Sequence, residues 1–334
     1  MQPNYRITEK ILNLVQKISE LTTQLSIEKR KLYLRKENRI RSIQSSLAIE
    51  NNSLSLEQVT DIIEGRRVLG PLKDIHEVQN AYEAYERVFR LNPYSLDDFL
   101  LAHGLLTKDL VRRSGQFRLG DVGVYDGEGR VVHVGARPQF VPNLVKDLFK
   151  WAEQSEVSAI VKSCIVHFEL EIIHPFEDGN GRMGRLWQSL ILSQWNPIFE
   201  WLPVESVIYA HQQGYYDALT ISNDTNDSTV FTEFMLQAIL ETLEEYQEKA
   251  DEDADRILHK TLKPRELEIY QLIKAYLEEH SQIANAKVQE ISGLSEATTR
   301  RYLNIFVEFG LLKTSGTTRD SLKKSAQNPL KIRS

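Results

Sequence analysis

Three observations predict a mainly α-helical chain that carries one β-hairpin and a small helix-turn-helix domain at its C-terminal end. Most apolar residues recur three and four positions apart, which is the spacing of one face of a helix. Residues 113–140 instead place β-branched and aromatic residues on both sides of an Asp-Gly turn, the pattern of a hairpin. Residues 262–334 contain a helix, helix, turn, helix pattern of their own.

The composition is that of an ordinary globular protein. The 334 residues suffice for two or three domains, and a content of 41% hydrophobic and 26% charged residues excludes wholesale disorder. A formal net charge of −6 gives no general attraction to nucleic acid or to an anionic membrane. We see neither a signal peptide nor an apolar run of membrane-spanning length, so we expect a cytoplasmic protein with no membrane partner. The single cysteine, Cys164, lies in an apolar helical run and is expected to pack in the core.

The first domain is expected over residues 1–95 and to be helical. Six apolar residues share one helix face by their spacing: Ile7, Ile11, Leu14, Ile18, Leu21 and Leu25. Residues 28–43 are rich in Lys and Arg, which is typical of a solvated helix. Two amphipathic helices follow, at 54–65 and 74–91, and Gly65 closes the first of them.

The second domain is expected over residues 96–255. A helix at 95–111 precedes the predicted hairpin, whose first strand contains Phe117, Leu119, Val122, Val124 and Tyr125. The turn is predicted at residues 126–129, and the second strand at Val131, Val132 and Val134. An isolated hairpin is only marginally stable, so we expect it to pack on another part of the chain.

Residues 174–185 concentrate the chemistry of the sequence. Apolar spacing predicts a helix over 157–173, and Pro175 prevents it from continuing. Gly179-Asn180-Gly181 then precede a second helix with the apolar residues Leu186, Trp187, Leu190, Ile191 and Leu192. Two glycines around an asparagine at a helix start allow several N–H groups to converge in a nest, which binds anions and above all phosphates.

The charged residues of this stretch suit a nucleotide. Arg182 and Arg185 lie three positions apart on the first turn of the second helix, and two guanidiniums beside a nest suit a polyphosphate. Asp178 is an oxygen ligand where Mg²⁺ could bridge phosphate oxygens. His174 supplies a group that accepts a proton near neutral pH. Together these residues predict a nucleotide-dependent transfer site.

The stretch matches the signature H-x-F-x-[DE]-G-N-G-R-x-x-R and thereby resembles the Fic/Doc family of adenylyltransferases. The resemblance implies a Fic-type helical bundle and the transfer of AMP from ATP to a Tyr, Thr or Ser hydroxyl of a target protein. It implies that His174 deprotonates this hydroxyl, that Asp178 holds Mg²⁺ and that Phe176 belongs to the core. The residues implied to bind ATP and its phosphates are Glu177, Asp178, Gly179, Asn180, Gly181, Arg182 and Arg185.

Residues 46–51 match [ST]-x-x-x-E-[GN], the inhibitory motif of many Fic proteins. Taken alone, this pattern is also that of a helix ending with Asn51-Asn52 as its cap. The resemblance implies that Ser46 and Glu50 lie on an inhibitory helix against the catalytic loop. A carboxylate at Glu50 would pair with a free guanidinium, that of Arg185 in the first place, and occupy the position of the ATP γ-phosphate.

The resemblance also gives the hairpin a role. In Fic proteins such a flap overhangs the active site and pairs with an extended segment of the target by strand addition. The docking edge is expected at Val134, Gly135 and Ala136. The alternative is a plain surface hairpin.

An adenine pocket is expected from the resemblance near residues 204–220. Its candidate ligands are His211 and Tyr216, although tyrosines at helical spacing are more often core residues. The polar cluster at 223–228 is expected to cap a helix over 229–246. The acidic residues 244–255 are interpreted as a helix tail or linker that ends the domain.

The last domain, residues 262–334, is interpreted as a winged helix-turn-helix. Helices are predicted at 266–277, at 283–291 and at 296–309 with Ser295 as the N-cap of the third, and Gly293 lies in the turn. The third helix is roughly neutral, and the basic residues gather instead in a C-terminal tail that contains Lys313, Arg319, Lys323, Lys324, Lys331 and Arg333. The domain could contact DNA or bind protein, and both readings stay open.

Three classes of function remain from the sequence. The first is a protein adenylyltransferase, which could modify itself and is inhibited by Glu50. The second is a de-AMPylase, in which the same site removes AMP and Glu50 acts as a base on water. The third is a nucleotide-sensing regulator that acts through the winged helix. The Doc branch of the family also shows that the scaffold can transfer a phosphoryl group instead. A homodimer stays open as well.

Overall fold

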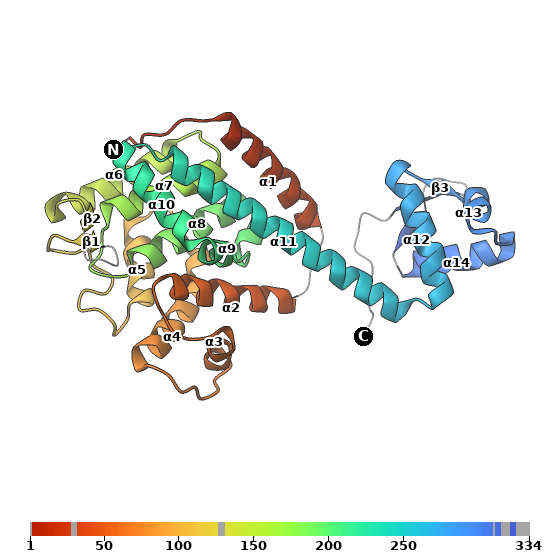
Figure 1. Cartoon of the computed structure of the whole chain (residues 1–334), viewed down its shortest axis with the longest axis horizontal. Helices are drawn as coiled ribbons and strands as arrows, with labels where there is room; N and C mark the ends of the chain where they lie inside the picture. The colour runs from red at the N-terminus through yellow and green to blue at the C-terminus, as the bar shows by residue number, and fades with distance from the viewer. Residues whose placement is uncertain (1, 28–31, 126–130, 310, 315–320, 325–334) are drawn as a thin grey trace. The chain divides into compact units, whose positions relative to one another are not determined.

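The computed structural model describes residues 2–27, 32–125, 131–309, 311–314 and 321–324. The chain forms two compact units (Figure 1). The first comprises Met1–Thr22 with Lys31–Glu244, and the second comprises Thr23–Arg30 with Glu245–Ser334. The fold is mainly helical, as the sequence predicts. Within the described ranges we find no helix that is long and apolar enough to cross a membrane.

The described secondary structure from the N-terminus to Leu106 consists of helices joined by short irregular segments. These helices are α1 (Glu9–Ile27), α2 (Leu32–Ile49), α3 (Leu56–Ile63), α4 (Leu72–Arg87) and α5 (Leu96–Leu106). Helix α2 ends where Asn51 adopts a left-handed conformation, with φ of 66°. Helix α3 begins at a capping box in which Ser55 and Gln58 satisfy each other's backbone N–H groups. Helix α2 packs against α4, α8 and α9, so the predicted inhibitory motif lies between elements of the core.

The remaining helices of the first unit enclose the predicted site. They are α6 (Val141–Gln154), α7 (Ala159–Ile173), α8 (Asn180–Trp195), α9 (Val204–Ala210), α10 (Gln212–Thr225) and α11 (Thr229–Thr261), the last of which continues into the second unit. Helices α7 and α8 pack against each other and are buried over nearly their whole length. Trp187 anchors this core, since it contacts Phe99 and Phe149 and donates a hydrogen bond to the carbonyl of Pro93 at 2.9 Å. The loop between α7 and α8 is therefore held between two immobile helix ends.

The hairpin consists of β1 (Gly123–Tyr125) and β2 (Val131–Val134), paired antiparallel with Gly123 opposite Val134. The first strand is shorter than the run predicted from Phe117 to Tyr125, whereas the second lies where it is predicted. Phe117 stacks instead on Phe176, with ring centroids 5.7 Å apart, and the N–H of Arg118 donates to the carbonyl of Pro175 at 3.1 Å. This segment is thus attached to the loop after α7 rather than to a second strand. The predicted turn at 126–129 lies outside the described residues.

Two helices differ from the prediction. Helix α6 is absent from the prediction, although Val141, Val145, Leu148 and Phe149 have the spacing of a buried face. The segment expected to hold the adenine pocket forms the two helices α9 and α10, because the backbone leaves helical geometry at His211 with φ of −112° and ψ of 34°. Helix α11 continues from the predicted end at 246 to Thr261, so the acidic residues 244–255 are helical.

The second unit contains α12 (Pro264–Glu279), α13 (Asn285–Ser292) and α14 (Glu296–Glu308) around a small apolar core. The strands β3 (Ile283–Ala284), β4 (Leu312–Thr314) and β5 (Ser321–Lys324) form an antiparallel sheet in the order β3-β5-β4. Helix α13 ends at Gly293, whose φ is +66°. The predicted wing residues 316–319 and the tail residues Lys331 and Arg333 lie outside the described residues.

Candidate active site

The loop after α7 presents His174 at a helix end. His174 adopts a left-handed conformation with φ of 51° and ψ of 63°, and its N–H still donates to the carbonyl of Leu170 at 3.0 Å. Asn180 braces the loop from the start of α8, since its Oδ1 accepts from the N–H of Phe176 at 2.9 Å and its Nδ2 donates to the Phe176 carbonyl at 3.0 Å. Phe176 is fully buried, as the resemblance implies. Asn180 therefore shapes the loop rather than presenting its amide to a ligand.

The imidazole of His174 is suited to accept a proton. Burial lowers its pKa below the ordinary value of a histidine, so the ring is neutral at pH 7. Its Nδ1 lies 3.3 Å from the carbonyl oxygen of Glu171, which favours the tautomer with the proton on Nδ1. The Nε2 lone pair is then available as a base.

Arg118 is a functional residue that the sequence reasoning missed. Its buried guanidinium donates to the carbonyl of His174 at 2.6 Å, to that of Ile173 at 3.3 Å and to that of Gly120 at 2.8 Å. It also donates to the carbonyl of Ala136, which follows the second strand of the hairpin. One side chain thus joins the end of α7 to both sides of the hairpin. The only sequence signal was a charge within an apolar run.

The hairpin lies beside the candidate base. A Cβ atom at Gly135 would lie 2.8 Å from Arg118 Nη2 and 3.1 Å from His174 Cβ, so a larger residue at this position would require its neighbours to shift. The N–H of Ala136 donates to the carbonyl of Ile173 at 3.3 Å, and His133 Nε2 lies 2.7 Å from the carbonyl of Ile172. Val134 is 64% exposed. Gly135 and Ala136 therefore lie beside the end of α7 that carries His174, and Val134 precedes them at the surface.

Arg185 is buried and held by the predicted inhibitory motif. It donates from Nε to Ser46 Oγ at 3.1 Å, and from Nη2 to the Ser46 carbonyl and to Glu50 Oε1, both at 2.9 Å. The ion pair that the sequence predicts between Glu50 and Arg185 is therefore present. Burial by itself lowers the pKa of Arg185, but the negative charge of Glu50 outweighs it and raises that pKa.

The carboxylate of Glu50 also covers the glycine nest. A Cβ atom at Gly181 would lie 2.2 Å from Glu50 Oε1, so this oxygen rests directly on the backbone of the nest. The Glu50 side chain is 36% exposed. Arg185 Nη1 is buried without a hydrogen-bond partner in the described part of the chain, and it points towards Gly181. A donor therefore remains open beside the Glu50 carboxylate and is available to a further acceptor oxygen.

Arg182 is placed between two carboxylates. Its Nη2 lies 2.9 Å from Asp178 Oδ1, and its Nη1 lies 3.2 Å from Glu77 Oε1 on α4. Burial by itself would raise the pKa of Asp178, but Arg182 and the N–H of Gly179 hold it below its ordinary value. Asp178 Oδ2 makes none of the hydrogen bonds found among the described residues. Glu177 is exposed at the rim of the loop.

His103, on α5, supports the same loop and was also missed. Its ring stacks on Phe176 with centroids 3.6 Å apart. The N–H of Gly115 donates to its Nδ1 at 3.0 Å, so Nε2 carries the proton and donates to the carbonyl of Asp178 at 3.0 Å. Burial lowers the pKa of His103 to about 4, which keeps it neutral.

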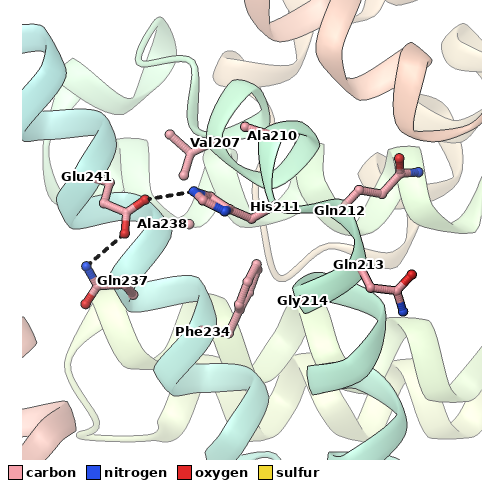
Figure 2. Close-up of a pocket in the computed structure, with 10 residues that line it drawn as sticks. All are labelled: Val207, Ala210, His211, Gln212, Gln213, Gly214, Phe234, Gln237, Ala238 and Glu241. Carbon is pink, nitrogen blue, oxygen red and sulfur yellow. Dashed lines mark hydrogen bonds and ion pairs between the residues drawn. The ribbon is translucent and has the colours of Figure 1, made fainter.

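The two candidate adenine ligands point in different directions. Tyr216 donates from its hydroxyl to the carbonyl of Ile49 at 3.3 Å, and Gln212 donates to the same oxygen at 3.0 Å. Tyr216 thus lies at the end of the inhibitory helix. His211 instead faces Glu241 on α11 at 3.4 Å, in a separate pocket of about 440 Å³ that Phe234 also lines (Figure 2). The structure therefore brings Tyr216, but not His211, to the inhibitory motif.

Comparison with known proteins places the chain in a family. A model of the Fic/DOC family matches residues 93–192. The crystal structure of a Fic family protein from Desulfovibrio desulfuricans is 37% identical, covers 97% of this chain and 98% of that one, and superposes with a TM-score of 0.72. The helical fold and the loop after α7 define a Fic domain. The chain belongs to the Fic family.

Two further relatives, with lower sequence identity, carry the name protein adenylyltransferase. The protein adenylyltransferase fic-1 of Caenorhabditis elegans is 30% identical over 250 residues, which cover 69% of this chain and 46% of that protein. The protein adenylyltransferase Fic of Aedes aegypti is 27% identical over 224 residues, which cover 63% and 42%. This chain thus spans less than half of the length of these two relatives.

Proposed function

We propose that the protein transfers AMP from ATP to a hydroxyl side chain of a target protein. The observation that carries the proposal is the placement of Glu50, a carboxylate that rests on the glycine nest and pairs with a buried arginine close to a neutral histidine. Two buried donors that lack hydrogen-bond partners among the described residues, Arg185 Nη1 and Arg182 Nε, add capacity for an anion with several oxygens. Relatives named protein adenylyltransferases support the same reaction.

The reaction follows from the residues of the loop. His174 Nε2 takes the proton of a Tyr, Thr or Ser hydroxyl, and the oxygen forms a bond to the α-phosphorus of ATP. The bond between the α-phosphorus and the bridging oxygen to the β-phosphate breaks, and pyrophosphate leaves. Arg182 and Arg185 stabilise the charge that develops on the leaving phosphates. The target segment pairs with the hairpin at residues 134–136, which lie next to the base.

The site fits a Mg²⁺ ion that is bound chiefly through ATP. Within the described residues no group of three or more acidic, histidine or cysteine side chains is arranged so that it could hold a metal ion. Asp178 offers a side chain that is 47% exposed, and Mg²⁺ is commonly held by one carboxylate together with phosphate oxygens and water. When bound, the ion would neutralise charge on the phosphates. Asp178 is the residue that would hold it.

Glu50 acts as a brake in this proposal. The γ-phosphate of ATP and the Glu50 carboxylate compete for Arg185, and a hydrogen bond to a charged group contributes about 1.5–3 kcal/mol. While Glu50 holds the arginine, ATP binds with its phosphates displaced, and the α-phosphorus does not face the hydroxyl. Ser46, at the start of the motif, holds the same guanidinium because its hydroxyl and its carbonyl both accept hydrogen bonds from Arg185.

The domain organisation is proposed in the same way. Residues 1–95 supply the inhibitory helix, residues 96–255 form the catalytic domain and residues 262–334 form a winged helix. The order of helices and strands in the second unit supports the last assignment. Whether this domain binds nucleic acid or protein is open to a direct binding assay.

One experiment separates the activities that the scaffold could support. The Glu50→Gly protein is incubated with ATP labelled on either the α- or the γ-phosphate, and the product is analysed by intact mass. We expect incorporation of the α-label with a gain of about 329 Da per site, the mass of an added AMP group. Incorporation of the γ-label would show phosphoryl transfer instead. Loss of an AMP-removing activity without any gain of transfer would favour the hydrolase.

A further inference from the structure

We propose that Glu77, on α4, is a positioning residue that holds Arg182 in the orientation required to bind the phosphates of ATP. The inference rests on the proposed function of the site, and it concerns a carboxylate that lies about a hundred residues before the arginine. Glu77 is buried, and a buried carboxylate is unfavourable unless charged or polar partners compensate it. Its partners therefore indicate its role.

Glu77 divides its two oxygens between two partners. Oε1 lies 3.2 Å from Arg182 Nη1, and Oε2 accepts a hydrogen bond from Asn52 Nδ2 at 2.8 Å. Lys73 approaches at 3.8 Å from the surface, with a side chain that is largely exposed. The principal charge partner of Glu77 is thus Arg182.

The two carboxylates on Arg182 differ in their access to solvent. The side chain of Glu77 is 8% exposed, whereas that of Asp178 is 47% exposed. A phosphate that enters the site arrives from the exposed side, where it replaces or shares the contact with Asp178. The contact with Glu77 lies behind the guanidinium and can persist when ATP is bound. Glu77 is therefore a support rather than a competitor of the nucleotide.

The geometry of Arg182 supports this division. Its Nε is buried and lacks a hydrogen-bond partner among the residues described, so a donor remains for an incoming oxygen while Nη1 stays on Glu77. An arginine side chain has several rotatable bonds, and fixing it before the ligand arrives removes part of the entropic cost of binding. A charge-assisted bond to a buried partner provides that fixation.

Glu77 is in turn held by the segment that carries the brake. Asn52 lies two residues after Glu50, and its N–H donates to the carbonyl of Leu47 at 3.0 Å, near the end of α2. Its side chain then donates to Glu77. One short segment thus contacts Arg185 directly and Arg182 through Glu77.

The test uses Glu77→Gln in the Glu50→Gly protein, because the amide keeps the shape of the side chain and removes its charge. We expect the affinity for ATP, measured by calorimetry, to fall about tenfold, since charge-assisted hydrogen bonds are roughly twice as strong as neutral ones. The affinity for adenosine, measured by ligand-observed NMR, should not change, because adenosine carries no phosphate. In an Arg182→Ala background, Glu77→Gln should have no further effect on ATP binding.

The matched control is Glu233→Gln. Glu233 is a partly buried carboxylate of α11 whose partners are Thr8 and Lys10, outside the site, and its replacement should leave ATP affinity unchanged. The inference is wrong if Glu77→Gln binds ATP as tightly as its parent, or more tightly. It is also wrong if ATP and adenosine affinities fall together, which would indicate a merely structural role.

Binding and transfer separate the two proposals. If ATP affinity falls as expected but the Glu50→Gly protein transfers no AMP, the inference holds and the proposed function fails. If that protein transfers AMP and Glu77→Gln leaves both its rate and its ATP affinity unchanged, the inference alone fails.

Discussion

Arg182 and Arg185 lie one helical turn apart and are both buried, yet their carboxylate partners differ. Arg185 pairs with Glu50, whose side chain is 36% exposed and covers the nest. Arg182 pairs with Glu77, whose side chain is 8% exposed and lies on the buried side of the arginine. A carboxylate on the ligand side competes with a phosphate. A carboxylate on the core side orients the arginine. Both are ion pairs between an arginine and a carboxylate. Their roles differ because the two carboxylates lie on different sides of the arginine relative to the ligand.

The largest effect is expected from removal of the base, which leaves both arginine pairs intact. His174→Ala in the Glu50→Gly protein should lower AMP transfer by about a thousandfold or more, since general-base catalysis contributes about 10²–10⁴ and the nucleophile here is a neutral hydroxyl. ATP affinity, measured by calorimetry, should stay close to that of the parent. A mutant that labels its target at the parental rate would exclude His174 as the base.

A smaller but still large effect is expected at the exposed partner of Arg182. Asp178→Ala in the Glu50→Gly protein should lower transfer more than about a hundredfold, because a metal that polarises phosphate contributes several kcal/mol. The remaining rate should no longer depend on the Mg²⁺ concentration, as a titration of that rate would show. If the Glu50→Gly protein itself kept its rate in excess chelator, the metal assignment would be wrong.

The length of the carboxylate on Arg185 sharpens the comparison further. Glu50→Asp keeps the charge but shortens the side chain by one methylene, so the ion pair weakens without disappearing. We expect a transfer rate between those of the parent and Glu50→Gly, about threefold above the parent. A rate equal to that of Glu50→Gly would mean that a negative charge at residue 50 does not inhibit unless the carboxylate reaches Arg185 as it does in glutamate.

The last prediction concerns the stability of the fold rather than the transfer rate, and it is made at His103, beneath the loop. Burial lowers the pKa of His103 to about 4, whereas an unfolded histidine titrates near 6.5. The unfolded state therefore binds an extra proton between these values, so this stabilisation is complete above about pH 6.5 and is lost as the pH falls towards 4. The stability difference between the parent and His103→Gln should be about 2 kcal/mol smaller at pH 5 than at pH 7.5. Urea unfolding at both pH values measures it, and a difference independent of pH would contradict the assignment.

The features predicted correctly from the sequence are those whose evidence is local. The loop at 174–185 carries its glycines, arginines and proline within twelve residues, and the motif at 46–51 contains both Ser46 and Glu50. The pair between Glu50 and Arg185 needed only the chemistry of opposite charges together with a family resemblance. The helices α7 and α8 followed from apolar spacing on either side of Pro175.

The features that the sequence did not reveal depend on contacts between distant segments. Arg118, Glu77 and His103 each lie in a stretch with ordinary helical or hairpin spacing, and only the fold brings them to the loop after α7. The break between α9 and α10 carries no glycine or proline. The candidate adenine ligands were chosen from one segment, and the break at His211 directs His211 and Tyr216 to different surroundings.

The most direct test of the central claim is the rate of self-modification of the parent and of Glu50→Gly with α-labelled ATP. We predict that the substitution raises the rate about tenfold or more, since about 1.4 kcal/mol corresponds to one decade. Adding Arg185→Ala to Glu50→Gly should abolish the gain, because the released arginine is itself required. Equal rates for the parent and Glu50→Gly, or a gain that survives the loss of Arg185, would contradict the account.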